Sequence, residues 1–214
     1  MSITGSSTNF NARMKQLTHI LGRKSRKELI GLMVRFIEKH PDLEQLVAMK
    51  KGELVSKIRG LFSMFWDWKE VRQLMSELDT ILEGVRSQKK LWGRDLLNEM
   101  EACANIMIKK ADNVFGEDEL AIFLEDWFET FGEVFVKTKP TIKEKREFVL
   151  KICELIKKDD YGFHESFEKA LISMCCSKKD AELIKEIVKP LESSYATAKE
   201  HYEDLYEELD EKSE

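Results

Sequence analysis

The hydrophobic and polar positions of this chain follow the helical period over almost its whole length. Apolar residues recur every three or four positions in successive windows of one to two dozen residues. No window alternates with the period of two that a half-buried strand requires. Short polar or Gly- and Pro-containing breaks separate the windows. The pattern therefore predicts an all-α protein, built from amphipathic helices with short connections.

Four windows assign their apolar residues to one face or to the core. In the window ELVSKIRGLFSMF, the residues expected to face inward are Leu54, Ile58, Leu61, Phe62 and Phe65. The helix after RSQKK is expected to bury Leu91, Trp92, Leu96, Leu97, Met100, Cys103, Met107 and Ile108. The helix after Pro140 has the stripe Ile142, Phe148, Val149, Ile152, Leu155 and Ile156. The window EDELAIFLEDWFETFGEVFVKT is apolar round more than half its circumference, so we expect it to lie between neighbouring helices.

Polar residues mark where several helices begin and end. Ser25 with Glu28 has the spacing of a capping box, and Asp67 is a further N-cap candidate with Glu70 at the capping-box position. Ser177 is expected to open a helix near the end of the chain. Breaks are expected at Asp112, Asn113, Gly116 and Pro190.

This series of helices favours an irregular α-solenoid, an α-α superhelix of stacked helical hairpins. A compact multi-helix bundle is the alternative. We expect a disordered N-terminus over residues 1–8 and a single all-helical domain over 9–210. An acidic helix is expected from about residue 191.

Composition excludes several classes of protein. With 10 Gly and 3 Pro in 214 residues, the chain has too few turn formers for an all-β fold. No window approaches the roughly 18 apolar residues of a membrane span. The N-terminal residues lack the apolar core of a secretory signal, and the four cysteines form no C-x-x-C pair. We therefore expect a cytoplasmic protein with reduced thiols and without a membrane partner, metal or cofactor.

No combination of residues points to catalysis. The adjacent thiols Cys175 and Cys176 end a helix, where the helix dipole disfavours a thiolate. His164 and Glu168 are four residues apart, but two ligands do not make a zinc site. We expect no catalytic residue, and a hydrolase or thiol redox enzyme is the distant alternative.

Charge is distributed unevenly along the chain. Residues 1–60 carry 12 Lys and Arg against 5 Asp and Glu, whereas residues 111–214 carry 15 against 27. The N-terminal third contains a basic cluster of Arg23, Lys24, Arg26 and Lys27. Since free N–H groups at a helix start add to this charge, the cluster is a candidate anion or nucleic-acid patch. An ordinary solvated basic face is the simpler interpretation.

Two aromatic and acidic corners interrupt the helical pattern. They contain Trp66, Asp67 and Trp68 in one case and Asp159, Asp160, Tyr161, Gly162 and Phe163 in the other. Aspartates that accept backbone N–H bonds and a glycine at positive φ are typical of a helix-ending turn, and this structural interpretation is favoured. The functional alternative is a pair of corners, Trp66 to Trp68 and Asp159 to Tyr161, that bind a basic partner.

Three stretches together resemble a known helical family. They are RKELIGLMVRFIEKHPDLEQLV (26–47), FWDWKEVRQLMSELDTILEGV (65–85) and KKDDYGFHESFEKAL (157–171). Their order and spacing are similar to those of the helical region that follows SWIM-type zinc fingers in bacterial and archaeal proteins. The resemblance covers about residues 26–175 and implies an α-superhelical platform without catalytic residues.

This chain departs from that family at two places. It has no C-x-C…C-x-H set of zinc ligands, so binding attributed to the finger does not transfer. Related proteins show Asp-Ser-Asp-Gly where this chain has Asn113, Val114, Phe115 and Gly116.

The sequence thus predicts a non-catalytic helical-repeat platform that mediates protein–protein interaction. A nucleic-acid-binding protein that uses the basic N-terminal third is the alternative, and the sequence leaves the oligomeric state open. Among the tryptophans, Trp92 and Trp127 are expected inside, and Trp66 or Trp68 nearer to a surface corner.

Overall fold

The computed structural model describes residues 24–25, 27–29, 31–32, 35, 52–192 and 198–213. The chain divides into two compact units, Met1–Met49 and Lys50–Glu214, where the sequence predicts one domain over 9–210. Most of the first unit lies outside the described residues, including Arg23 and Arg26 of the basic cluster. The fold below is that of the second unit.

Helices make up nearly all of the second unit. They are α4 (Glu53–Leu61), α5 (Val71–Ser87), α6 (Arg94–Lys109), α7 (Glu117–Lys137), α8 (Ile142–Lys157), α9 (His164–Met174), α10 (Lys178–Glu192) and α11 (Ala198–Ser213). Two short 3-10 helices, η2 (Lys89–Leu91) and η3 (Ala111–Asn113), lie in connections. No strand occurs in the described ranges, so the predicted all-α class is confirmed.

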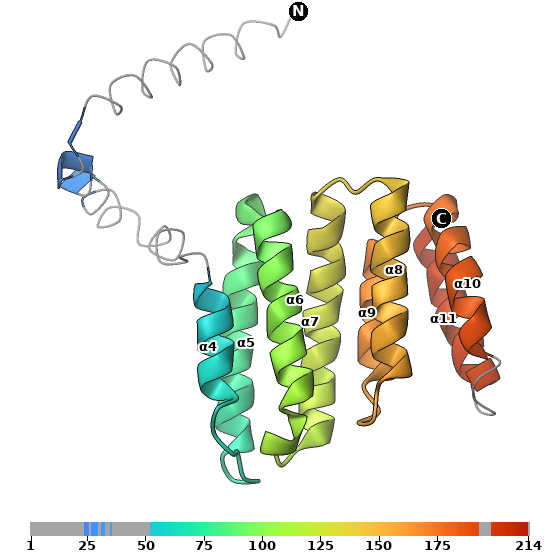
Figure 1. The fold of residues 1–214 in the computed structure, drawn as a ribbon, viewed down its shortest axis with the longest axis horizontal. Helices are drawn as coiled ribbons and strands as arrows, with labels where there is room; N and C mark the ends of the chain where they lie inside the picture. Colours follow the sequence, from blue (N-terminus) through green and yellow to red (C-terminus); the bar gives the residue numbers. More distant parts are fainter. Residues whose placement is uncertain are drawn as a thin grey trace, which may run out of the picture. The chain divides into compact units, whose positions relative to one another are not determined.

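The helices form two layers of antiparallel hairpins (Figure 1). In one layer α4 packs against α6 and α8 against α10, and in the other α5, α7, α9 and α11 pack in sequence. Within the hairpins α6 packs on α7, α8 on α9 and α10 on α11. All helices of the first layer therefore begin at the same end of the unit, the upper end in Figure 1. The choice between a solenoid and a compact bundle stays a prediction.

Helix α7 lies at the centre of the packing. It contacts α5, α6 and α9, as predicted from apolar residues round more than half of its circumference. Its side chains form an aromatic core with α8 and α9: Phe128 lies edge-on to Phe167, and Phe135 stacks on Phe148 at 4.1 Å between ring centroids. Trp127 is fully buried. These buried aromatic rings contribute to the packing of α7, α8 and α9.

The predicted helix boundaries are confirmed at most places. Ser25 Oγ accepts a hydrogen bond from Glu28 N, and Ser25 N donates to Glu28 Oε2, which is the expected capping box. Ser177 Oγ accepts from Asp180 N at the start of α10. The break between α6 and α7 falls at residues 110–116.

Several boundary predictions are wrong. Pro190 does not interrupt α10, which continues to Glu192, because in the last turn a missing N–H removes only one hydrogen bond. The acidic C-terminal helix covers Ala198–Ser213, so the residues near 191 belong to α10 instead. Asp67 caps the turn before α5, through bonds that its Oδ1 accepts from Lys69 N and Glu70 N, and α5 itself begins one turn later.

Three apolar residues expected to face inward are exposed. Phe65 is 62%, Leu91 48% and Ile142 77% exposed. Phe65 lies in the connection after α4, Leu91 is the last residue of η2 and Ile142 is the first residue of α8, so each lies at an end of the unit that the neighbouring helices no longer cover. The helical period assigns a residue to a face but does not say how far along the axis that face is covered.

Within the part of the chain that the structure describes, every helix is too short or too polar to cross a lipid bilayer.

Candidate interaction surface

Two connections that are far apart in the sequence lie side by side at the lower end of the unit in Figure 1. They are the α4–α5 connection (residues 62–70) and the α6–α7 connection (residues 110–116). Trp66 N donates to Asn113 O at 2.7 Å, and Phe115 N donates to Trp66 O at 2.8 Å. The Asn113 side chain adds a third bond, from Nδ2 to Phe62 O. These bonds hold the two connections together.

Trp66 anchors this end and thereby sets the direction of its neighbours. It is buried, with 5% of its surface exposed, and its Nε1 donates to Leu61 O at 2.8 Å. The Asp67 carboxylate, which caps the following turn, fixes the backbone on the other side. Trp68 emerges on the surface with Lys69 Nζ 5.1 Å from the centroid of its ring. The expectation that one of these two tryptophans lies near a surface corner is confirmed for Trp68.

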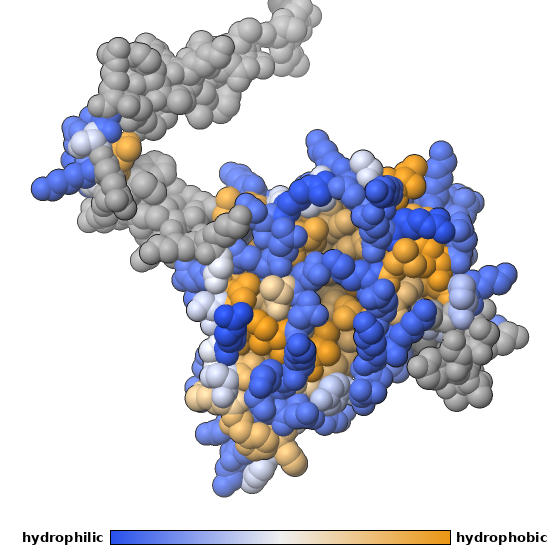
Figure 2. Space-filling view, viewed as in Figure 1, coloured by the Kyte–Doolittle hydropathy of each residue, from blue (hydrophilic) through white to orange (hydrophobic). Residues whose placement is uncertain are grey.

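Large apolar side chains are exposed on both connections. Met64 is 53%, Phe65 62%, Trp68 65% and Phe115 63% exposed, and we call these four residues the apolar end. Phe65 precedes Trp66 and Phe115 follows Val114, the two residues paired by the isolated parallel bridge. Figure 2 shows hydrophobic surface at the tip of the α4–α5 hairpin. Clustered exposure of this kind marks interaction surfaces more often than single exposed apolar residues do.

The second predicted corner contacts the α6–α7 connection. Asp112 lies close enough to the phenol of Tyr161 to be the main reason why the pKa of Tyr161 lies above its ordinary value. Asp159 Oδ1 accepts from Tyr161 N, Gly162 takes a φ of 82°, and Tyr161 stacks on Phe163. The local-turn interpretation is thus confirmed for Asp159, Tyr161, Gly162 and Phe163. Asp160 is exposed.

The two predicted corners are therefore neighbours of one central connection. Residues 110–116 pair with Trp66 on one side and reach Tyr161 through Asp112 on the other. Sequence reasoning missed the part of this surface that is most apolar, because the helical period assigns Phe65 to an inward face and Phe115 enters only as a position of the family resemblance. The available signal was a run of large apolar residues, SMFWDW, outside any helical period.

The basic cluster is described only in part. Lys24 is half-buried and its Nζ lies 3.8 Å from Glu28, while Lys27 is exposed. Arg23 and Arg26 lie outside the described residues, so the anion patch stays a prediction.

The thiols and the His164–Glu168 pair differ in how far they are exposed. Cys103, Cys153 and Cys175 are buried, and burial raises the pKa of Cys103 to about 12 and that of Cys153 to about 11. Cys176 is exposed. His164 Nδ1 lies 3.7 Å from Asp159 Oδ2, whereas Glu168 is buried. Within the described ranges no three His, Cys, Asp or Glu side chains are placed to share a metal ion.

Two cavities lie away from the apolar end. One, of about 250 Å³, lies among α7, α9 and α11 and is lined by Glu125, Glu165, Glu168, Lys169, Ile172, Asp204, Leu205 and Glu208. The other, also about 250 Å³, lies between α6 and α8 over Phe128 and Phe131 of α7. An ion pair between Lys151 and Glu101, 2.8 Å long, joins its two walls. Neither was predicted, since each combines residues from three helices.

No family model, curated protein or solved structure matches this chain. The resemblance to the SWIM-associated helical family therefore stays a prediction.

Proposed function

We propose that this protein is a non-catalytic helical platform that binds another protein through its apolar end. The observation that carries the proposal is the exposure of Met64, Phe65, Trp68 and Phe115 on two connections that hydrogen bonds hold together. Burying exposed apolar surface contributes about 25 cal/mol per Å², and aromatic side chains dominate the energy of most interfaces. A partner that covers these four side chains would therefore gain binding free energy from burying them.

The rigidity of the apolar end supports the same proposal. A surface that must be ordered on binding loses part of the interaction free energy to conformational entropy. Here the backbone on both sides of Phe65 and Phe115 is already fixed by the bonds to Trp66 and by the Asn113 side chain. The two connections are thus ready to bind without a large ordering cost. The proposal places the protein in the cytoplasm, where its thiols stay reduced.

Affinity purification from the protein's own cell extract tests this proposal. The tagged protein is compared with the variant Trp68→Ala/Phe115→Ala, and the bound proteins are quantified by mass spectrometry. The matched control is Ile122→Ala/Leu150→Ala, which removes two side chains that are 65% and 47% exposed on α7 and α8. We expect a stoichiometric partner with the wild type and the control, and its loss with the Trp68/Phe115 variant. A partner retained equally by all three proteins would overturn the proposal.

The same experiment separates the nucleic-acid alternative. Partners held through nucleic acid are lost when the extract is treated with nuclease, and their binding falls steeply with salt. A partner that survives nuclease and depends on Trp68 and Phe115 supports the platform. Partners that vanish with nuclease, irrespective of the apolar end, would move the function to the basic cluster around Lys24 and Lys27.

A further inference from the structure

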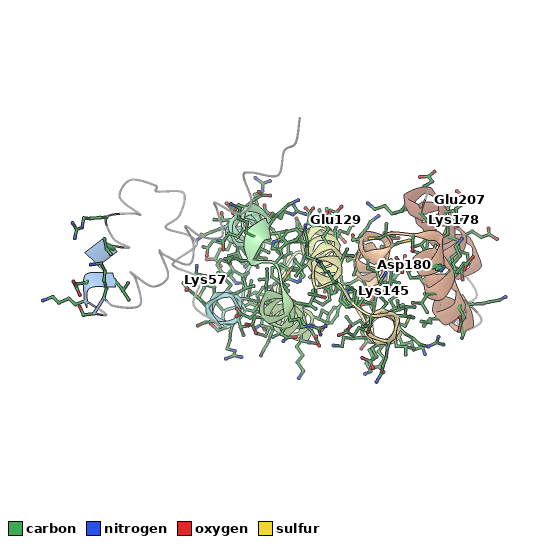
Figure 3. The ribbon with its side chains drawn as sticks, turned by 90° about the horizontal axis from the view of Figure 1, so that it is seen from above. Lys57, Glu129, Lys145, Lys178, Asp180 and Glu207 are labelled. Atoms are coloured by element: carbon green, nitrogen blue, oxygen red, sulfur yellow. The ribbon has the colours of Figure 1, made fainter. Side chains whose placement is uncertain are left out.

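The end of the unit opposite to the apolar end is basic and also carries exposed aliphatic side chains. The α5–α6 and α7–α8 connections lie there, and Figure 3 looks onto this end from above. Leu91 and Ile142 are exposed, and so are four lysines, Lys89, Lys90, Lys139 and Lys143. We call these six residues the basic end. Residues 86–95 and 137–147 together contain nine Lys and Arg and three Asp and Glu. Arg86, Lys145 and Arg146 also pair with carboxylates outside these ranges, so the exposed lysines supply the positive charge of this end.

Side-chain contacts hold the two parts of the basic end together. Arg94, the first residue of α6, pairs with Glu144 in the first turn of α8. Arg86 near the end of α5 contacts Asp126 and Thr130 of α7. The positive dipole ends of α6 and α8 meet the negative dipole ends of α5 and α7 here, so the positive charge of this end comes from its side chains.

The apolar end has a net charge of the opposite sign to that of the basic end. Residues 62–72 and 109–119 contain six Asp and Glu against four Lys and Arg, around the exposed Met64, Phe65, Trp68 and Phe115. One end of the same helices thus offers aromatic residues with a net negative charge, and the other offers aliphatic residues with a net positive charge. Complementary charge of this kind steers two surfaces together and fixes their register, while apolar contact supplies affinity.

The two ends of one chain cannot meet each other. Helix α7 runs between them with 21 residues, which at 1.5 Å per residue separates the ends by about 30 Å. We infer that the apolar end binds the basic end of a second copy, so that copies of this chain associate head to tail. The inference rests on the proposed function, because it names the partner of the same apolar end. A head-to-tail contact uses different surfaces on the two copies, so it builds open chains or rings instead of a closed twofold dimer.

Two variants, each blocked at one end, test the inference. Trp68→Asp/Phe115→Asp blocks the apolar end. Lys90→Glu/Ile142→Asp blocks the basic end, with substitutions at an exposed connection and at the first residue of α8, where an acidic side chain is tolerated. Ile122→Asp/Leu150→Asp, on exposed positions of α7 and α8, is the control. Mass is measured by sedimentation over a series of protein concentrations, because the association of copies depends on concentration.

We expect the wild type and the control to grow beyond a dimer with concentration and to dissociate when salt is raised. Each blocked variant alone stays a monomer. Their equimolar mixture forms a heterodimer and nothing larger, because each partner keeps one intact end. Self-association of either blocked variant, or a mixture that stays monomeric, would overturn the inference. So would a wild type that is monomeric throughout, and the affinity purification then decides separately whether the apolar end binds a different protein.

Discussion

Gly132 of α7 lies directly against Ala170 of α9. A Cβ atom at position 132 would lie 2.6 Å from the Ala170 carbonyl oxygen and 2.8 Å from the Ser173 Cβ. Neither distance is possible for a real side chain, so the close approach of these two central helices depends on the absence of one at position 132. The hydrophobic period that predicts α7 does not reveal this requirement.

Gly132→Ala is therefore expected to destabilise the fold although alanine favours helices. Overpacking of this kind costs about 1–3 kcal/mol, because one helix must move away from the other. The control is Gly84→Ala in α5, where a Cβ atom meets nothing within 4 Å. That change should raise the free energy of unfolding by about 0.5–1 kcal/mol through helix propensity. Urea denaturation measures the stability of both variants. If the two midpoints shift in the same direction, the close contact at Gly132 does not limit the packing of α7 on α9.

Asp180 joins α10 to α8 through a carboxylate that is only 7% exposed. Its Oδ1 lies 2.6 Å from Lys145 Nζ, and its Oδ2 accepts from Cys176 N. Figure 3 shows Lys145 and Asp180 close together between these helices. Asp180→Ala leaves a largely buried ammonium without this carboxylate, and breaking such a pair costs about 3 kcal/mol or more. Chemical denaturation gives the loss of stability.

A second pair between the same two helices provides the control. Arg146 and Glu186 lie 3.0 Å apart, but their side chains are 51% and 65% exposed. An exposed pair contributes less than about 1 kcal/mol, so Glu186→Ala should change the midpoint only slightly. Equal losses in the two variants would show that burial does not distinguish the pairs.

The sequence predicts the helices of this unit well because each apolar face is a local pattern. It also predicts the burial of Trp92 and Trp127, which lie at helical spacing with other apolar residues, and both are buried. It fails for Phe65, Leu91 and Ile142, since whether a helix end is covered depends on the lengths of its neighbours. All three belong to the two ends proposed here as interaction surfaces.

Two further features of the structure, a capping box and a backbone pairing, differ in whether a short stretch of sequence predicts them. The capping box of Thr141 and Glu144 at the start of α8 has a local signal, the sequence TIKE, in which Thr and Glu have the capping-box spacing. The pairing of Trp66 with Val114 was not readable, because it joins residues from different hairpins. The apolar end could therefore be recognised only in part, through Trp68 and the turn at Asp67.

Glu168 of α9 is a buried carboxyl in an acidic surrounding. Burial and the neighbouring charges of Glu165 and Glu208 raise the pKa of Glu168 to about 8, and Lys169 offsets them only in part. Glu125 of α7 and Asp204 of α11 line the same cavity. The carboxyl is therefore neutral in the folded protein at neutral pH, whereas in the unfolded chain it ionises near its ordinary value of 4.5.

This difference makes the stability of the fold depend on pH. Between pH 4.5 and about 8 the folded form binds more protons than the unfolded form, so the free energy of unfolding falls as the pH rises through this window. Glu168→Gln keeps the shape of the neutral carboxyl but cannot ionise, so its stability relative to the wild type should increase up to about pH 8 and then level off. Urea denaturation of both proteins at intervals from pH 5 to 9 measures the difference. Glu182→Gln, at an exposed position of α10 and not among the residues that line this cavity, is the control and should run nearly parallel to the wild type. A Glu168→Gln curve that also stays parallel to the wild type would mean that Glu168 is ionised in the folded protein.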